Sequence, residues 1–170
     1  FQNVRKGGII AINLEKGDDL IEVRLTNGNN EIVLITKQGM SIRFQEDQVR
    51  SMGRNAGGVK GIELDKGDAV VALALVDPES TLLVAGGNGI GKRTDFEEYR
   101  QQSRGGKGII TMKTGDKTGN VVGALTVRDS DELMLITSGG QMVRIPVKGI
   151  REAGRNTMGV KLINLADKDK

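Results

Sequence analysis

The sequence predicts an all-β protein built from a repeat of about 50 residues. Ile, Val and Leu dominate its apolar residues and only 2% of all residues are aromatic, which favours strands over helices. Glycine occurs 25 times and proline twice in 170 residues, as expected for a fold with many tight turns. A glycine followed by a β-branched residue recurs at Gly8-Ile9, Gly58-Val59, Gly108-Ile109 and Gly159-Val160, with spacings of 50, 50 and 51 residues.

Other positions keep the same spacing, so the repeat covers whole units rather than a single motif. In three units a turn glycine is followed four residues later by an arginine, at Gly39 and Arg43, Gly89 and Arg93, and Gly140 and Arg144. Another arginine stands four residues before the recurring glycine, at Arg54, Arg104 and Arg155.

Each unit is predicted to contribute four short strands, because apolar and β-branched runs alternate with turn signals. In the second unit we predict strands at Val59–Leu64, Ala69–Val76, Thr81–Ala85 and Ile90–Thr94. The matching strands are Leu20–Leu25, Glu31–Thr36 and Met40–Phe44 in the first unit, and Val121–Val127, Glu132–Thr137 and Gln141–Ile145 in the third. The stretch Asp95–Tyr99 has helical character and is long enough for a single turn.

Four strands in a unit of roughly 50 residues are typical of a propeller blade. We therefore expect one repeat domain of four-stranded antiparallel blades at residues 1–48, 49–98 and 99–147, with a partial blade at 148–170. Three blades rarely close a propeller, so we expect an open array or a piece of a longer protein. Phe1 stands in the middle of a pattern, which favours a piece.

The composition excludes several classes of chemistry. The chain has no cysteine and no histidine, so it can form no disulfide, thiolate metal site or cysteine nucleophile. We interpret the paired carboxylates Asp18-Asp19 and Asp131-Glu132 as solvated turn residues, and we expect Tyr99, the one tyrosine, to pack between blades. No apolar run is long enough to cross a bilayer and no signal peptide is evident, so we expect a cytoplasmic protein that is not catalytic on its own.

One segment comes close to a phosphate-binding loop. Residues 86–93 carry the G-x4-G-K spacing, but Arg93 stands where the loop needs Ser or Thr. A strand, not a helix N-terminus, is expected to follow, so we do not predict nucleotide binding.

The charges are segregated within each unit, although the net charge is only +3. Acidic residues gather in turns, whereas basic residues gather where the last strand of one unit leads to the first strand of the next. We call residues 49–62, 99–115 and 147–163 the junction segments. The first two contain no acidic residue and the third contains only Glu152, whereas the stretch before them has only Arg5 and Lys6.

A repeat places its junction segments along one rim, so the basic residues should form a regular stripe that matches the phosphates of DNA without reading bases. Gly57-Gly58 and Gly105-Gly106 could let backbone N–H groups approach a phosphate, and arginine offers a bidentate fork to it. The alternative is a merely solvated rim with glycines that serve only turns. We predict main DNA contacts at Arg50, Arg54, Lys60, Arg100, Arg104, Lys107, Arg151, Arg155 and Lys161, and secondary contacts at Arg43, Lys92, Arg93 and Arg144.

Three stretches carry a resemblance to a known family. Residues 51–62, SMGRNAGGVKGI, and 153–162, AGRNTMGVKL, resemble the G-R-x-x-x-G-V-[KR] blade motif of the C-terminal domain of DNA gyrase A. A degenerate copy of that family's Q-[RK]-R-G-G-[RK]-G box is found at Gln102-Ser103-Arg104-Gly105-Gly106-Lys107-Gly108. Because Ser103 replaces a base, we interpret this as a secondary copy and place the principal box upstream of Phe1.

The resemblance implies a β-pinwheel, a propeller-like disc whose blades exchange strands and whose basic outer edge wraps double-stranded DNA. It implies support for negative supercoiling by a bacterial, nucleoid-associated type II topoisomerase, together with the rest of gyrase A and with gyrase B. ATP and magnesium would be used elsewhere in that enzyme, so no cofactor is expected in this domain. The alternatives are the related topoisomerase IV domain, which shares the fold with degenerate boxes, and a protein-binding propeller that uses the loops on its disc face.

Overall fold

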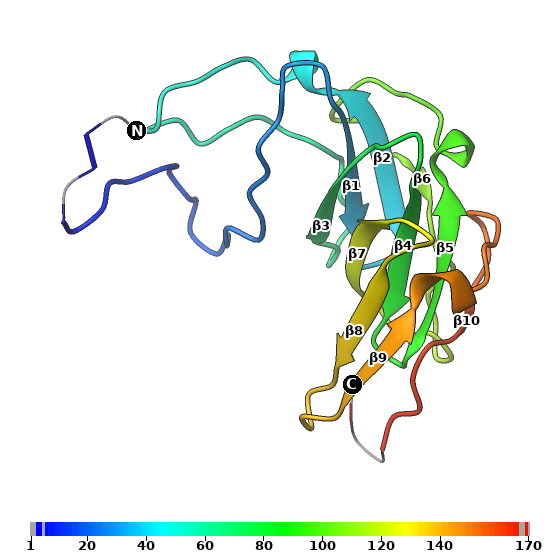
Figure 1. Cartoon of the computed structure of the whole chain (residues 1–170). Helices are drawn as coiled ribbons and strands as arrows, with labels where there is room; N and C mark the ends of the chain where they lie inside the picture. Colours follow the sequence, from blue (N-terminus) through cyan, green and yellow to red (C-terminus); the bar gives the residue numbers. More distant parts are fainter. Residues whose placement is uncertain (1–2, 5, 167–168, 170) are drawn as a thin grey trace.

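The structure, a computed structural model, describes residues 3–4, 6–166 and 169. Phe1 and Arg5, which entered the sequence predictions, lie outside the described residues. The described chain forms short antiparallel strands joined by turns and three 3-10 helices, as Figure 1 shows. The all-β prediction is therefore confirmed.

The first sheet has the strand order β3-β1-β2-β6 and is antiparallel throughout. Its centre is the hairpin of β1 (Glu31–Thr36) and β2 (Met40–Gln45). One edge is β3 (Val70–Leu75), which belongs to the following unit, and the other is β6 (Ile109–Ile110), which belongs to the unit after that. One blade therefore needs residues from three successive units.

The second sheet repeats this arrangement one unit later, in the order β10-β5-β4-β7. Its central hairpin consists of β4 (Thr81–Gly86) and β5 (Ile90–Asp95). The edges are β7 (Val121–Val127) and β10 (Val160–Lys161). Because β3 and β7 pack against each other, these edges face the inside of the array, and β6 and β10 form its outer edge.

The third hairpin, of β8 (Glu132–Ile136) and β9 (Met142–Pro146), pairs only with itself within the described residues. Each hairpin ends in a 3-10 turn: η1 (Glu46–Gln48), η2 (Phe96–Glu98) and η3 (Val147–Gly149). The predicted helical turn at 95–99 is thus confirmed as η2, and it has a counterpart in each unit.

Two predicted strands do not form. Residues 20–25 and 59–64 contain no strand, although both have the expected β-branched pattern. A strand needs a hydrogen-bonding partner, and the described residues place no second strand beside either segment. The consequence is clear at Leu25, whose side chain is 95% exposed, and in Figure 1 the N-terminal segment swings away from the sheets.

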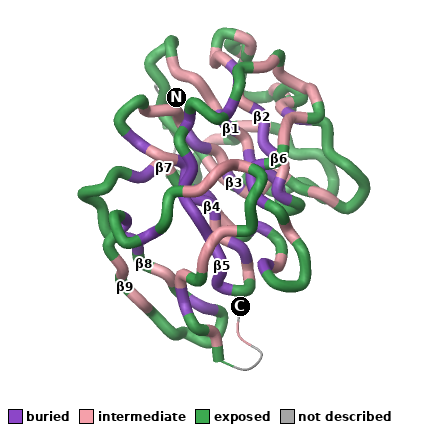
Figure 2. The backbone as a smooth tube through the Cα atoms, turned by 90° about the vertical axis from the view of Figure 1, so that its right-hand side faces the viewer, coloured by how far each residue is buried: buried purple, intermediate pink, exposed green. Residues whose placement is uncertain are grey.

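The core is aliphatic and lies between the first two sheets. It includes Val33 and Ile35 from β1, Ala72 from β3, and Leu82 and Val84 from β4. Figure 2 shows the buried backbone gathered along β4 and β5 in the middle of the molecule. Tyr99 belongs to this core: it is 1% exposed, and its hydroxyl lies 2.7 Å from that of Thr111.

Candidate nucleic-acid interface

Each of the last two junction segments runs along the outer edge of a sheet and bulges away from it between two points of attachment. In the second segment, the Gln102 N–H donates to the Arg43 carbonyl at 2.8 Å, and Ile109–Ile110 then pair with β2. In the third, the Ala153 N–H donates to the Arg93 carbonyl at 2.9 Å, and Val160–Lys161 pair with β5. Residues 103–108 and 154–159, which we call the edge loops, project between these attachments.

Packing against the sheet explains why glycine occupies certain positions of the edge loops. Gly108 has φ +75° and Gly159 has φ +97°. A Cβ atom at Gly108 would collide with the Ser41 carbonyl oxygen, and one at Gly159 with that of Gly91. The Gly105 N–H, considered above as a phosphate donor, instead donates to the Gly61 carbonyl at 2.7 Å. These glycines therefore serve the close approach of the loop to the sheet and to its neighbour.

Successive junction segments lie side by side in a constant register. Each junction segment accepts one backbone bond from the unit before it: Asn13 N–H donates to the Ala56 carbonyl at 3.2 Å, Glu63 N–H to Gly106 at 2.9 Å, and Lys113 N–H to Thr157 at 3.0 Å. The three pairs occupy equivalent positions in the repeat, so the outer edge presents the same loop at regular intervals.

Six of the predicted DNA contacts have exposed side chains on this outer edge: Arg50, Lys60, Arg100, Lys107, Arg151 and Lys161. Among the described residues, only Lys60 of this set has a carboxylate within 4 Å, that of Glu63 at 3.9 Å. Lys113 and Lys148 are exposed on the same segments and were not among the predicted contacts. They occur in acid-free stretches of the junction segments, and that signal could have selected them. We call the eight residues the outer-edge bases.

Arg54, Arg104 and Arg155 are turned toward the neighbouring unit. The Arg104 guanidinium donates from Nε to the Gln48 carbonyl at 3.1 Å and from Nη1 to the Lys60 carbonyl. Arg155 repeats both bonds one unit later, to the Glu98 carbonyl at 3.0 Å and the Ile110 carbonyl. Arg54 donates to the Ile10 carbonyl at 2.8 Å.

Lys92 is fully buried, contrary to its predicted place on the rim. Its ammonium donates to the carbonyls of Gly154 and Arg155 and to the Thr157 hydroxyl, the last at 3.0 Å. Burial lowers the pKa of this ammonium to about 8, while the Glu98 carboxylate opposes the shift. Lys92 thus supports an edge loop from beneath, and a phosphate could not reach it.

Two of the arginines predicted as secondary DNA contacts, Arg93 and Arg43, also bond to backbone carbonyls of the chain. Arg93 is 7% exposed, donates to the Ile150 carbonyl at 2.8 Å and pairs with Asp129. Arg43 donates to the carbonyls of Phe96 and Tyr99, at 2.7 and 3.1 Å, and pairs with Glu31. Both arginines sit in central strands and hold the 3-10 turn of the next unit, so we leave them out of the interface. Arg144 is exposed and pairs with Glu132.

Many acidic residues lie at the end of the sheets where the hairpins begin and end. We call the turns at 77–80 and 128–131, together with η1 and η2, the acidic end. Turns and 3-10 helices are in contact at this end of the sheets, since the Glu46 N–H donates to the Asn30 carbonyl and the Val147 N–H to the Asp131 carbonyl, both at 3.0 Å. A hollow of about 340 Å³ at this end is lined by Glu79, Asp95, Asp129 and Glu152, among others.

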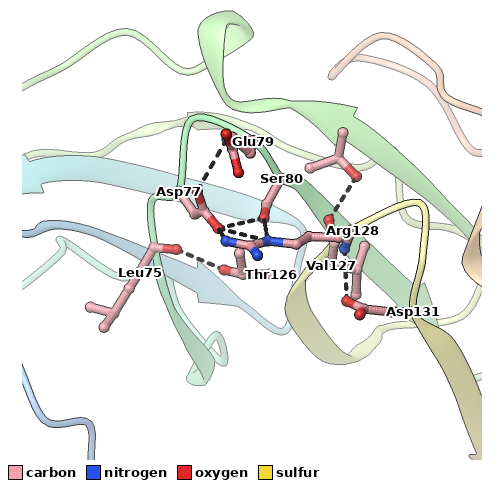
Figure 3. A network of polar contacts seen from close by, with 9 residues as sticks. Leu75, Asp77, Glu79, Ser80, Thr126, Val127, Arg128 and Asp131 are labelled. Atoms are coloured by element: carbon pink, nitrogen blue, oxygen red, sulfur yellow. Dashed lines mark hydrogen bonds and ion pairs between the residues drawn. The ribbon is translucent and has the colours of Figure 1, made fainter.

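One ion pair ties two turns of the acidic end together (Figure 3). Arg128 donates to the Asp77 carboxylate from Nη2 at 2.6 Å and from Nε at 3.2 Å. Ser80 donates to the same carboxylate at 2.8 Å, and the Glu79 N–H donates to it at 3.1 Å. The bonds from Arg128, Ser80 and Glu79 lower the pKa of Asp77 to about 2.

Other kinds of site find little support in the described residues. These residues contain no group of three or more acidic side chains that could hold a metal ion. The phosphate-loop-like stretch 86–93 contains the turn between β4 and β5 and continues into β5, where Lys92 is buried. No helix of the described chain is both long and apolar enough to cross a membrane.

The chain matches one family model in four consecutive segments. The family is described as "DNA gyrase C-terminal domain, beta-propeller", and the matched residues are 1–27, 30–77, 80–128 and 131–170. Among curated proteins, DNA gyrase A of Clostridium acetobutylicum is 53% identical over 163 residues, which are 96% of this chain and 20% of that protein. The corresponding protein of Halalkalibacterium halodurans is 58% identical over 167 residues, which are 98% and 20% of the two chains. The chain thus spans about a fifth of the length of these relatives.

Two solved structures have closely similar folds. The C-terminal domain of DNA topoisomerase IV superposes with a TM-score of 0.90 at 28% identity, over 96% of this chain and 52% of that one. The DNA gyrase A C-terminal domain superposes with a TM-score of 0.89 at 28% identity, over 96% and 56% of the two chains.

Proposed function

Because the chain belongs to the family of DNA gyrase A C-terminal domains, we propose that its outer edge binds the phosphate backbone of double-stranded DNA without reading base sequence. The proposal rests on one observation above all. Successive junction segments lie side by side in constant register, and each presents exposed bases.

The chemistry of the outer-edge bases suits phosphates. Lysine and arginine side chains that project into solvent can release counterions from DNA when they meet its backbone, and this release drives binding without sequence preference. The strongest candidates are six predicted contacts that are exposed and whose side chains bond to no backbone carbonyl of another unit: Arg50, Lys60, Arg100, Lys107, Arg151 and Lys161. Lys113 and Lys148 extend the same surface.

In the intact protein we propose that this edge helps to wrap DNA and so supports negative supercoiling, with the rest of gyrase A and gyrase B as partners. Bending 20–30 base pairs costs about 1–6 kcal/mol, so several junction segments must contribute contacts. We place catalysis and cofactor binding outside this domain, and the protein in the bacterial cytoplasm with the nucleoid.

The salt dependence of binding tests the proposal directly. A 30-base-pair duplex is titrated with the 170-residue chain by fluorescence anisotropy at several salt concentrations. If about six outer-edge bases meet phosphates, the logarithm of the association constant falls with the logarithm of salt concentration with a slope of roughly −5. The double variant R100Q/K107Q should reduce the magnitude of that slope by about 2, because two phosphate contacts are lost.

A matched control is K66Q, which removes an exposed lysine from the turn after the first junction segment. The slope should not change in this variant. Binding that does not depend on salt, or an unchanged slope in R100Q/K107Q, would contradict the proposal and would favour a propeller that binds a protein partner with its disc-face loops.

A further inference from the structure

We propose that Arg54, Arg104 and Arg155 are positioning residues: each ties its own junction segment to the preceding unit and thereby sets the spacing of the outer-edge bases. The sequence pattern alone predicts phosphate contacts for these arginines. The inference rests on the proposed DNA-binding function only for its consequence in binding, because the ties themselves are intramolecular.

The same bond occurs three times at the same position of the repeat. Nη1 of Arg54, Arg104 and Arg155 donates to the carbonyls of Ile10, Lys60 and Ile110, respectively. Each acceptor belongs to the unit before the arginine. A solvated arginine side chain would not be expected to bond to the equivalent carbonyl in three different units. The repetition therefore indicates a structural contact that is part of the fold.

A second tie strengthens the inference in the last two units. Gln48 and Glu98, at the ends of η1 and η2, each receive two bonds from an arginine residue that lies two units later in the sequence. The backbone carbonyl of each accepts from the arginine Nε, and the side-chain oxygen accepts from the arginine backbone N–H, at 2.7 Å for Arg104 and 2.8 Å for Arg155. The planar guanidinium with its fixed fork can bridge the two carbonyls at once, which the single ammonium of a lysine cannot reproduce.

The tie lies beside the backbone bond that joins the two segments. The Lys60 carbonyl accepts from Arg104, and next to it the Glu63 N–H donates to the Gly106 carbonyl while the Gly105 N–H donates to Gly61. In the following unit, the Lys113 N–H donates to the Thr157 carbonyl close to the Arg155 tie. Loss of one guanidinium should therefore loosen the backbone at one boundary and leave the other intact.

Hydrogen exchange of the 170-residue chain tests the ties without DNA. In R104K, the amide of Glu63 should exchange about tenfold faster or more, because hydrogen bonds to a charged donor are lost. The amide of Lys113 should keep its protection. R155K should give the reverse pattern, and R54K should accelerate only Asn13, whose N–H donates to Ala56. K107Q, in the same loop as Arg104, is the matched control and should change neither amide.

Unchanged exchange at Glu63 in R104K would overturn the inference, as would an equal acceleration at Glu63 and Lys113 in both single variants. If R104K unfolds the whole chain, R54K still decides the question, because Arg54 has one such tie rather than two and its reporter amide is Asn13.

DNA binding by the same variants separates positioning from phosphate contact. R104K keeps a positive charge. If residue 104 contacted a phosphate of the DNA, the R104K variant would therefore bind DNA as the unchanged chain does. The positioning role predicts instead that R104K and R104Q weaken binding by a similar factor, several-fold each. If the unchanged chain does not bind DNA but the exchange pattern holds, the proposed function fails and the ties stand.

Discussion

The outer edge and the acidic end carry opposite charges, and the charged side chains of the two regions differ in the partners that they find within the chain. At the acidic end some carboxylates are bound by groups of the chain itself: Asp77 accepts from Arg128, from Ser80 and from the Glu79 N–H, as Figure 3 shows. On the outer edge the bases at the start of each junction segment, Arg50, Arg100 and Arg151, project into solvent. The turns of the acidic end offer backbone N–H groups to a carboxylate, as the Glu79 N–H does to Asp77.

This difference separates charges that serve the fold from charges that are available to a partner. The side chains of Arg50, Arg100 and Arg151 form no hydrogen bond or ion pair within the described residues, so their position needs another explanation, and a phosphate backbone supplies one. The basic residues that do find carbonyls, such as Arg104 and Lys92, serve the fold as the turn acids do.

The largest expected effect is on DNA affinity. The triple variant R50Q/R100Q/R151Q removes the one exposed base that recurs in all three junction segments. At 0.1 M salt we expect the association constant to fall by about 10²–10³-fold, because three of roughly six phosphate contacts are lost. Fluorescence anisotropy with a 30-base-pair duplex measures the change.

The matched control for the triple variant neutralises three exposed acids of the acidic end, as D47N/E79Q/E97Q. It should bind DNA as well as the unchanged chain, or a few-fold more tightly because repulsion is reduced. A comparable loss of affinity in this control would mean that the two regions do not differ in the way the structure suggests.

The next effect is on stability and concerns the buried Lys92 ammonium under the edge loop 154–159. K92M should lower the free energy of unfolding by about 2 kcal/mol, because the acceptor atoms of residues 154, 155 and 157 lose their donor. Urea denaturation followed by circular dichroism measures the loss. The salt slope of DNA binding should remain unchanged, since Lys92 is buried.

K161M should weaken DNA binding and leave stability almost unchanged, the opposite of what is expected for K92M. Lys161 is exposed on the same outer edge, so its loss should change the free energy of unfolding by less than about 0.5 kcal/mol. The magnitude of the salt slope should drop by about 0.9. Equal stability losses in the two lysine variants would contradict the assignment of Lys92 to the interior.

Local signals predicted the hairpins well. The predicted strands at 31–36, 81–85 and 121–127 agree with β1, β4 and β7 to within a residue. Turn glycines and the alternation of apolar and polar residues are local features, so the sequence shows them directly. Arg43 and Arg93 were misplaced for a non-local reason. They lie on β2 and β5, which become central strands only when β6 and β10 arrive from two units later.

The candidate interface was predictable as a set of segments but not residue by residue. The scarcity of acids in the junction segments, whose only acid is Glu152, pointed to the outer edge, and that signal also covers Lys113 and Lys148. It could not distinguish Arg100 from Arg104, because both are arginines in the same basic stretch. The distinction depends on whether a carbonyl of the preceding unit lies within reach, as that of Lys60 does for Arg104.

A smaller effect is expected at the acidic end. D77N should lower the free energy of unfolding at neutral pH by less than about 1 kcal/mol, because the ion pair with Arg128 is partly exposed and solvent screens it. Urea denaturation at pH 7 measures the loss, and DNA affinity should be unaffected. A loss of several kcal/mol would show that this turn-to-turn link matters more to the array than its exposure suggests.

The smallest expected effect is the pH dependence of that same pair. The pKa of Asp77 in the folded chain, about 2, lies below the ordinary value of 3.8. The Asp77 carboxylate therefore binds a proton more weakly in the folded chain than in the unfolded chain. The stabilisation by Asp77 is therefore fully present above about pH 4 and is lost as the pH falls through 2. The stability difference between the unchanged chain and D77N, measured by urea denaturation from pH 5 to pH 2, should shrink accordingly. In an R128M background the Asp77 pKa should return toward its ordinary value, and the difference should lose most of this dependence. A difference that persists unchanged to pH 2 in the Arg128 form would contradict the role of the ion pair.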